Sequence, residues 1–238
     1  MKTVRADLHV HTCLSPCADD GMRAAAIVER AGQAGLDMIA ICDHNSAENV
    51  GAVVKAARGR GLAVIPGIEI TSSEEVHILG LFSTELEAAR VQQIIYENLP
   101  GENSQEAFGA QLVVDERDRV VGRNSRLLIG ATTLTVEQVV DAIHRCEGLA
   151  IASHIDRERF SIIGQLGLIP QGLELDAVEV RGSWAGAEAY GYPVVMSSDA
   201  HFLDEIGRRQ SCFFVEDACI GEIARALRRE LGRRVLSN

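Results

Sequence analysis

The sequence predicts an α/β fold, a closed or nearly closed barrel of strands covered by helices. Apolar segments of strand length alternate with helix-like segments along most of the 238 residues, as in strands joined by helical crossovers. Hydrophobic residues make up 47% of the chain but aromatic residues only 4%, so aliphatic side chains must fill the core, as in buried parallel strands. Without a visible linker or repeat, we expect one domain over residues 1–238.

The first half of the chain sets the alternation. We expect strands at 4–10, 38–43 and 62–70, and helices at 22–35, 46–59 and 84–98. A further strand at 76–82 follows its predecessor after only a few residues. A parallel crossover needs about a dozen residues or more, so this strand and 62–70 should form an antiparallel hairpin.

Residues 100–134 interrupt the pattern. Two short apolar pieces, 111–114 and 120–121, flank the polar turn at 115–118, which predicts a β-hairpin excursion that could serve as a flap or an oligomer contact. The alternation then resumes. We expect a helix at 135–147, strands at 149–154, 175–180, 193–198 and 211–215, and a last helix at 219–232.

Charge and targeting signals limit the possible partners. The formal net charge is −11, and because phosphate neutralisation dominates nucleic-acid binding, we expect no long nucleic acid on the general surface. Bound divalent cations would still create a local site for a small anion. No signal peptide or membrane-spanning stretch is visible, so we expect a cytoplasmic protein without a membrane partner. The cysteines should be reduced and mostly buried.

The histidines are concentrated at strand ends. Of the seven in the chain, six lie at the ends of expected strands, where α/β barrels carry their active sites. These six are His9, His11, His44, His77, His154 and His201. The exception, His144, lies inside the helix 135–147 and is expected to be an ordinary helix residue.

Two clusters place these histidines beside each other or beside a carboxylate. Alternate strand residues point to the same side, so His9 and His11 share a face, and Asp199 and His201 have the same spacing. Glu69 ends a very apolar strand, where an unpaired carboxylate is costly and a metal ion would satisfy it. Histidine is the commonest metal ligand, although polar residues leaving the core would show the same spacing.

The other histidines are less specific on their own. The pair Asp43-His44 could cap the next helix instead of binding a metal. His77 begins its strand, but the expected hairpin returns it beside Glu69, and His154 ends another strand. All these groups at one end of a barrel predict a metal centre, and imidazole with carboxylate suits Zn, Mn or Fe better than Ca.

These motifs, in this order, resemble the polymerase and histidinol phosphatase (PHP) family from residue 6 to about 202. They are Asp-x-His-x-His at 7–11, Asp-His at 43–44, Pro-Gly-x-Glu at 66–69, Val-His-Ile-Leu-Gly at 76–80, Ser-His at 153–154 and Ser-Asp-Ala-His at 198–201. The resemblance implies a distorted (β/α)7 TIM-like barrel with a centre of two or three divalent metal ions.

The resemblance also implies a ligand set for each ion. The first ion would be held by His9, His11, Glu69 and Asp199, the second by Glu69, His77 and His154, and the third by His44 and His201. Many relatives carry Ser-Asp-Gly soon after the second His, where this chain has the longer segment 15–21. The remaining third-site ligand could be Asp19, Asp20 or Cys17, and we favour Asp19. Alternatively, Asp19 or Asp20 caps the next helix.

We therefore expect metal-assisted hydrolysis of a small phosphate ester. Glu69 and Asp199 would act through the metals, and His201 could protonate the leaving group if the third ion is absent. Arg157 and Arg181 follow strand ends and could bind a phosphate. Alternatively, each could pair with a nearby acid, such as Asp156 or Glu179. The leading substrate is a 3′,5′-nucleoside bisphosphate or a short oligonucleotide end, and histidinol phosphate is the second candidate.

Other classes are less compatible with the sequence. Many amidohydrolases need a carboxylated lysine between two metals, and neither Lys2 nor Lys55 lies at a suitable position. No Gly-x-Ser-x-Gly elbow or P-loop lysine is present. A metal-binding regulatory module without turnover remains an alternative, although a site with open metal positions is usually catalytic.

Overall fold

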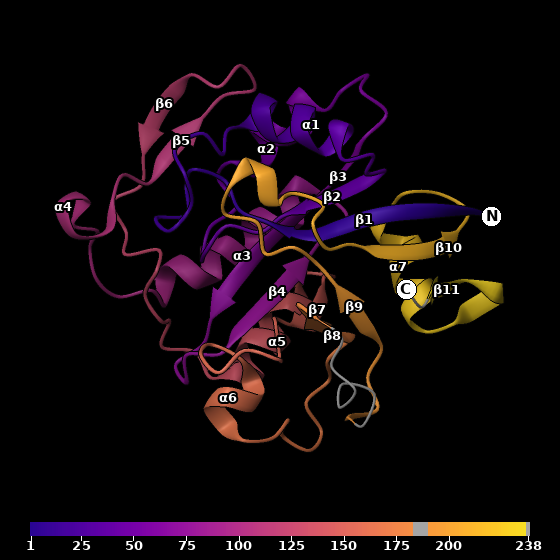
Figure 1. Cartoon of the computed structure of the whole chain (residues 1–238). Coiled ribbons are helices and arrows are strands. Elements are labelled where there is room, and N and C mark those ends of the chain that lie inside the picture. The colour runs from indigo at the N-terminus through magenta and orange to yellow at the C-terminus, as the bar shows by residue number, and fades with distance from the viewer. Residues whose placement is uncertain (183–189, 237–238) are drawn as a thin grey trace.

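The computed structural model describes residues 1–182 and 190–236 (Figure 1). Its strands are β1 (Lys2–Val10), β2 (Met38–Ile41), β3 (Ala63–Thr71), β4 (His77–Leu81), β5 (Leu112–Val114), β6 (Val120–Arg123), β7 (Leu149–Ala152), β8 (Ala177–Val180), β9 (Val194–Met196), β10 (Ser211–Val215) and β11 (Arg234–Leu236). Its α-helices are α1 (Ala24–Gln33), α2 (Val50–Ala56), α3 (Glu85–Glu97), α4 (Gln105–Phe108), α5 (Val136–Arg145), α6 (Ile162–Leu166) and α7 (Ile220–Leu227). Short 3-10 turns are η2 (Leu203–Glu205) and η3 (Glu230–Gly232).

A nearly closed ring of strands forms the body of the molecule. The main sheet runs in the order β11-β10-β1-β2-β3-β4-β7-β8-β9. Beyond β9 the chain returns to β1, where His11 N–H donates to the Ala200 carbonyl at 3.0 Å and Ala200 N–H donates to the His9 carbonyl at 3.2 Å. The predicted α/β barrel is confirmed, and the reversed strand β4, antiparallel to both neighbours, distorts it.

The two predicted hairpins are confirmed. Thr71 pairs with His77 across β3 and β4, so the start of β4 lies beside the end of β3. Strands β5 and β6 form a separate two-stranded sheet, seen at the edge of the molecule in Figure 1. The strand predicted at 211–215 is present as β10, but it does not continue the ring of strands. It pairs antiparallel with the start of β1 and lies outside the ring.

Several boundaries differ from the predicted ones. Helix α2 begins at Val50 instead of residue 46, because Asn45 adopts a positive φ of 51° and Gln92 of α3 accepts the Ala47 N–H at 2.7 Å. Helix α7 ends at Leu227, well before residue 232, and Arg229 then has a φ of 56°. Helix α6 and strand β11 were not predicted, because they are too short to show a periodic pattern.

Alternation along the strands separates two apolar layers. Inside the ring, Met38, Ala40 and Ile65 pack with Leu79 and Ile151. On the outside, α3 and α5 pack against β3 and β4 through one cluster, and α1 and α2 against β2 through another. Within the described ranges, no helix has the length and hydropathy needed to cross a bilayer.

Candidate metal centre

The inner faces of the strands carry polar groups to one end of the ring. On β3, Glu69 follows Ile65 at the even spacing that keeps it on the inner face. On β8, Glu179 follows the inner residue Ala177 in the same way. Both carboxylates are fully buried. Such groups are costly without compensating partners, so this end of the barrel must supply cations or hydrogen-bond donors.

The first group of side chains meets at the end of β1. His9 Nε2 lies 3.1 Å from His11 Nε2. Each of these nitrogens is also 3.4 Å from a Glu69 carboxylate oxygen, and 3.5 and 3.4 Å from Asp199 Oδ1, respectively. The structure thus brings together the four residues predicted for the first metal.

Outer hydrogen bonds fix which ring nitrogens face this group. His9 Nδ1 lies 3.1 Å from a Glu179 carboxylate oxygen and donates to it. The Ser15 hydroxyl donates to Asp43 at 2.7 Å, so it accepts from His11 Nδ1 at 2.9 Å. With both Nδ1 atoms bonded to outer partners, the two Nε2 atoms face each other at 3.1 Å inside the cluster. At this distance a proton or a metal ion must lie between the two nitrogens, since two lone pairs would repel.

The second group lies on the other side of Glu69. His77 Nδ1 is 3.0 Å from Glu69 Oε1, and His154 Nε2 is 3.3 Å from the same oxygen. His154 Nε2 and Glu69 Oε2 are buried, and neither makes a hydrogen bond of good geometry among the described residues, although Glu69 Oε2 lies 3.0 Å from His44 Nδ1. Buried polar atoms are nearly always satisfied, so close contacts without a hydrogen bond fit a cation bound between these groups.

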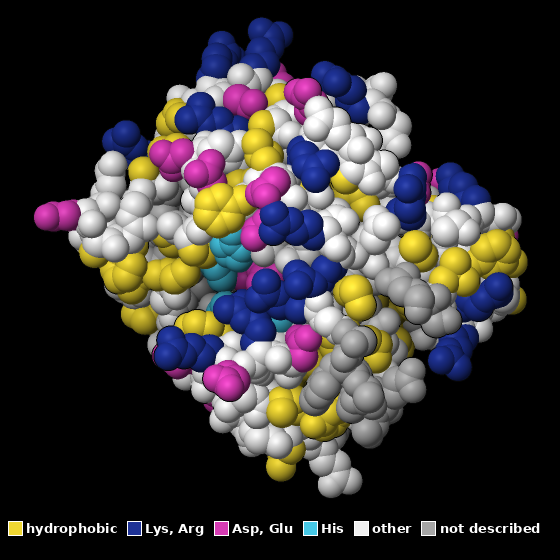
Figure 2. Space-filling view, viewed as in Figure 1, with side chains coloured by type: hydrophobic (Ala, Val, Ile, Leu, Met, Phe, Trp, Pro, Cys, Tyr) yellow, Lys and Arg dark blue, Asp and Glu magenta, His cyan; other side chains and the backbone are white. Residues whose placement is uncertain are grey.

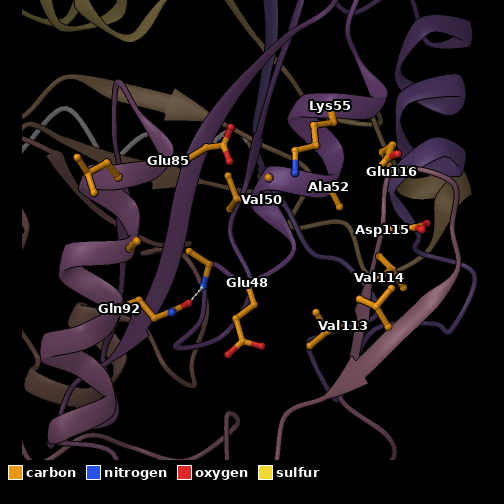
Figure 3. A pocket seen from close by; sticks show the side chains of 15 residues that line it. Glu48, Val50, Ala52, Lys55, Glu85, Gln92, Val113, Val114, Asp115 and Glu116 are labelled. Atoms are coloured by element: carbon orange, nitrogen blue, oxygen red, sulfur yellow. Dashed lines mark hydrogen bonds between the residues drawn. The ribbon is translucent and has the colours of Figure 1, made fainter.

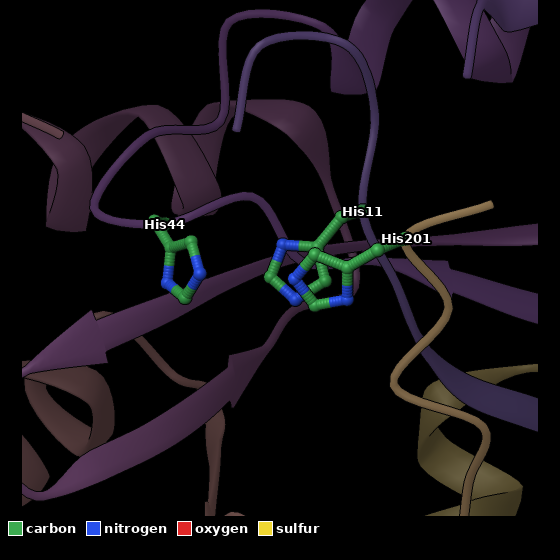
Figure 4. Close-up of side chains that lie close together, drawn as sticks. All are labelled: His11, His44 and His201. Atoms are coloured by element: carbon green, nitrogen blue, oxygen red, sulfur yellow. The ribbon is translucent and has the colours of Figure 1, made fainter. Parts of the chain in front are cut away.

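A third group contains His11, His44 and His201, whose ligand atoms lie within 4.8 Å of one another. Figure 4 shows the three rings turned toward a common space, from the segments that follow β1 and β2 and from the loop that contains His201. His201 Nδ1 donates to the Asp199 carbonyl at 2.9 Å, which leaves Nε2 free. That nitrogen lies 3.1 Å from Cys17 Sγ.

The two aspartates of the 15–21 segment are arranged differently. Asp19 Oδ1 accepts the Gly21 N–H at 2.8 Å, and its own N–H donates to the His201 carbonyl at 2.9 Å. Asp19 and Asp20 are both exposed. The structure therefore places the Cys17 thiol, and not the Asp19 carboxylate, against the third group. Neither aspartate caps α1, whose N-cap is Arg23.

Burial and mutual contacts shift the pKa values in this cluster. Burial raises the pKa of Glu69, but His77, His9 and His44 outweigh it and hold the pKa well below its usual range. For Asp199, His9 and His11 likewise overcome burial and lower the pKa. Both carboxylates are therefore ionised.

Among the thiol and imidazole groups, burial lowers the pKa of His77 to about 4. Burial opposes the Cys17 thiolate, but His44 and His201 outweigh it and lower the thiol pKa to about 6. His77 is therefore neutral at pH 7, the form of imidazole that binds metals, and thiolate is the form of cysteine that does so.

Two of the predicted ligands have unusual backbones. His154 has a φ of 29° and Asp199 a φ of 55°, values uncommon for residues with a Cβ. The His154 N–H donates to Glu179 Oε1 at 3.1 Å, which helps to hold the bend. Strained backbone of this kind occurs at functional sites, where it directs a side chain.

The two predicted phosphate-binding arginines differ in their contacts. Arg157 Nη1 lies 3.1 Å from Asp199 Oδ2, and its side chain is 35% exposed, so Arg157 lies at the rim of the cluster. The backbone N–H of Arg181 donates to Asp156 at 3.0 Å, and its Nε is buried without a described partner. Figure 2 shows the histidines in a hollow of the surface, with Lys and Arg side chains directly beside them.

Other features lie away from this cluster. The seventh histidine, His144, lies on α5. Its Nε2 is 3.0 Å from Asp176 Oδ2, a contact expected of an ordinary helix residue. A pocket of about 610 Å³ lies between α2, α3 and the β5–β6 hairpin (Figure 3). Glu48, Glu85 and Asp115 line it, and none of the predicted ligands does. Its acidic lining makes it unsuitable for a phosphate.

Sequence reasoning missed the residues that orient the ligands. Glu179 was considered only as a partner of Arg181, and Ser15 not at all. Glu179 could have been found by the argument used for Glu69, because both are carboxylates in apolar strands. Ser15 gave no comparable signal, since its hydroxyl acts through a loop contact with Asp43.

Buried His and carboxylate groups gathered at one end of a barrel are the arrangement found in metal-dependent hydrolases. Comparison with family models specifies the family. The PHP domain model matches residues 7–169, and the PHP-associated model matches residues 181–230. The first match covers more than half of the chain, so the chain belongs to the PHP family.

Two characterised relatives carry the same name. A 5′-3′ exoribonuclease of Haemophilus influenzae is 33% identical over 82 residues, which cover 33% of this chain and 29% of that protein. The 5′-3′ exoribonuclease Rnm of Escherichia coli is 27% identical over 198 residues, 65% of this chain and 67% of the relative. The chain thus matches less than a third of the Haemophilus protein's length.

A solved structure shares the fold over nearly the whole chain. The lesion-specific endonuclease from Pyrococcus furiosus superposes with a TM-score of 0.78 at 18% identity, over 98% of this chain and 58% of that one. A complex of Endonuclease Q holds a 27-mer duplex with an abasic lesion at the active site, with the same coverage and TM-score.

This complex corrects one prediction. We expected the acidic composition to exclude long nucleic acid, and the exclusion is wrong, because a protein of this fold holds a long duplex. The argument used the net charge of −11, but phosphates respond to the local field around a site. Here that field includes Arg157 beside the cluster.

Proposed function

We propose that this protein is a metal-dependent nuclease or nucleotide phosphoesterase that hydrolyses phosphate esters at short oligonucleotide ends or in 3′,5′-nucleoside bisphosphates. The observation that carries the proposal is the convergence of His9 Nε2 and His11 Nε2, 3.1 Å apart, on the buried carboxylates of Glu69 and Asp199. The names of the two exoribonuclease relatives support nucleic acid as the source of the phosphate ester.

The residues fit a centre of two or three divalent ions of Zn, Mn or Fe. His9, His11, Asp199 and Glu69 would hold the first ion, and Glu69 with His77 and His154 the second. The contacts of Glu69 support this fit, because His44 and His154 approach its carboxylate at 3.0 and 3.3 Å without hydrogen bonds of good geometry. Such ions lower the pKa of water and neutralise phosphoryl oxygens when bound.

The protein's own groups would orient the substrate around that centre. Arg157 reaches the cluster from its exposed rim, and a guanidinium can bind a phosphate through two parallel hydrogen bonds. His201 lies beside the rim with Nδ1 held by the Asp199 carbonyl at 2.9 Å. Where no third ion is bound, His201 is the group suited to protonate the leaving oxygen.

The test is hydrolysis by protein reconstituted separately with Mn, Zn and Fe. We expect release of mononucleotide from a 5′-phosphorylated RNA oligonucleotide or of phosphate from a 3′,5′-nucleoside bisphosphate. Histidinol phosphate and an abasic DNA duplex distinguish the other phosphoesterase classes. Glu69→Gln should be inactive, while His144→Ala, which changes a histidine bound to Asp176, should match the wild type.

Three results would overturn the proposal or part of it. Protein that binds at least two metal equivalents but hydrolyses none of these compounds would be a metal-binding module without turnover. Hydrolysis of histidinol phosphate alone would retain the metal centre and reject the nucleic-acid substrate. Full activity after removal of all metal would reject the metal-dependent mechanism itself.

A further inference from the structure

The open side of the histidine cluster is bordered by a cysteine. Cys17 Sγ lies 3.1 Å from His201 Nε2, and the thiol also interacts with the side chain of His44. His201 Nδ1 is engaged by the Asp199 carbonyl, so the nitrogen that faces the sulfur is the one able to bind a metal. Cys17 itself is exposed, which leaves solvent access to this side of the cluster.

A second observation points to a cation here. His44 is only 4% exposed, and its Nδ1 lies 3.0 Å from Glu69 Oε2 but makes no hydrogen bond of good geometry among the described residues. The ligand atoms of His11, His44 and His201 lie within 4.8 Å of one another. The rings of His11 and His201 stack at 4.2 Å between centroids. Convergent imidazoles beside a buried carboxylate are a donor set that suits a transition-metal ion.

The loop geometry selects the sulfur over the neighbouring carboxylates. Asp19 N–H donates to the His201 carbonyl, and Asp19 Oδ1 turns back to the Gly21 N–H. These two hydrogen bonds hold Asp19 in the loop, with its Oδ1 bonded to the Gly21 N–H. Upstream, Ala18 N–H donates to the Ser15 carbonyl at 3.0 Å, closing a turn that contains Cys17. The turn brings the thiol to the histidines.

We propose that Cys17 is a thiolate ligand of the third metal ion, together with His44 and His201. The proposal rests on the metal centre of the proposed function and adds the identity of its missing ligand. A thiolate is a soft donor that favours Zn or Fe over Mg and Mn. The third site should therefore be the most zinc-selective of the three, unlike a site completed by aspartate.

Cobalt substitution tests the ligand directly, without reference to activity. A cobalt–thiolate bond gives a sulfur-to-metal charge-transfer band in the near ultraviolet, and imidazole and carboxylate ligands do not. We expect the band in cobalt-loaded wild type, in Asp19→Ala, and in the matched control Cys219→Ser, which changes the exposed cysteine at the N-cap of α7. Cys17→Ser should lose the band and one metal equivalent while it retains the others.

Alkylation gives a second measurement on the intact protein. Zinc should protect Cys17 from iodoacetamide, as followed by peptide mass spectrometry, while Cys219 stays reactive with and without zinc. Full reactivity of Cys17 in zinc-loaded protein would overturn the inference.

The cobalt titration also separates the two proposals. If wild-type protein binds three equivalents without the band, or if Asp19→Ala and not Cys17→Ser loses an equivalent, Cys17 is not a ligand and the proposed function stands. If reconstituted protein binds less than one equivalent of metal, the proposed function and this inference both fail.

Discussion

Glu179 provides a sharp test of how the cluster is positioned. Its carboxylate accepts the His9 Nδ1–H, with its two oxygens at 3.1 and 3.2 Å, and it accepts the His154 N–H at 3.1 Å. One buried carboxylate thus orients a residue of the first group and one of the second. We predict that Glu179→Gln weakens metal binding at both sites without removing a ligand.

The magnitude follows from the hydrogen bonds. A glutamine oxygen at the Oε1 position still accepts from His9 Nδ1–H and from the His154 N–H, but the negative charge is lost and an NH2 group at the Oε2 position faces the same donor His9 Nδ1–H. Hydrogen bonds to charged groups contribute about 1.5–3 kcal/mol, and substitution of an outer-shell partner typically costs about tenfold to a hundredfold in metal affinity. We expect a loss in this range, measured by competition with a chromophoric chelator.

Asp176→Asn is the matched control. Asp176 flanks the same strand and also accepts from a histidine and a backbone N–H, those of His144 and Ala150, but outside the cluster. Its substitution should leave metal affinity at the wild-type value. Wild-type affinity in Glu179→Gln, or an equal loss in both variants, would refute the reasoning.

Three further predictions concern the bridge, the rim and the fold. Glu69→Gln should lower metal content at both sites, as measured by elemental analysis, and unchanged content would rule out a bridging role. Arg157→Ala should lower kcat/KM for a bisphosphate about tenfold to a hundredfold and for a simple monoester much less, whereas equal losses would assign Arg157 to support of Asp199. Hydrogen bonding to Arg233 lowers the pKa of Glu222 from 4.5 to about 2. Glu222 therefore stabilises the folded state above pH 4.5, and the contribution disappears as pH falls through 2. In metal-free Glu222→Gln, the thermal midpoint should depend less on pH across this window, and an unchanged pH dependence would contradict this.

The strand ends explain why so much of the site was predictable. Each histidine of the cluster follows or begins a strongly apolar strand, and parallel strands deliver their ends to one side of a barrel. His77 is informative, because the short connection to Glu69 forced an antiparallel hairpin and so placed both residues together. These inferences needed only local patterns. The ligand roles themselves, and the organisation of residues 1–238 as one domain, stay predictions.

The third site could not be resolved in this way. The choice among Cys17, Asp19 and Asp20 depends on a hydrogen bond between Asp19 N–H and the His201 carbonyl, which joins two loops far apart in the sequence. The family pattern favours an aspartate such as Asp19, but the side chain that lies against His201 is Cys17. Loop conformation is set by such tertiary contacts, and spacing alone does not contain them.

The error on nucleic acid has a related cause and a consequence for binding. Composition sums charge over the whole surface, whereas substrate binding depends on the potential at one hollow. In this protein the net charge of −11 is a sum over all surfaces, whereas Lys and Arg side chains lie directly beside the hollow with the histidines (Figure 2). Arg157 contacts Asp199 there at 3.1 Å. If the proposed function holds, a phosphate that enters the hollow meets this local positive charge, whatever the sign of the total, because the field at short range is set by the nearest charges.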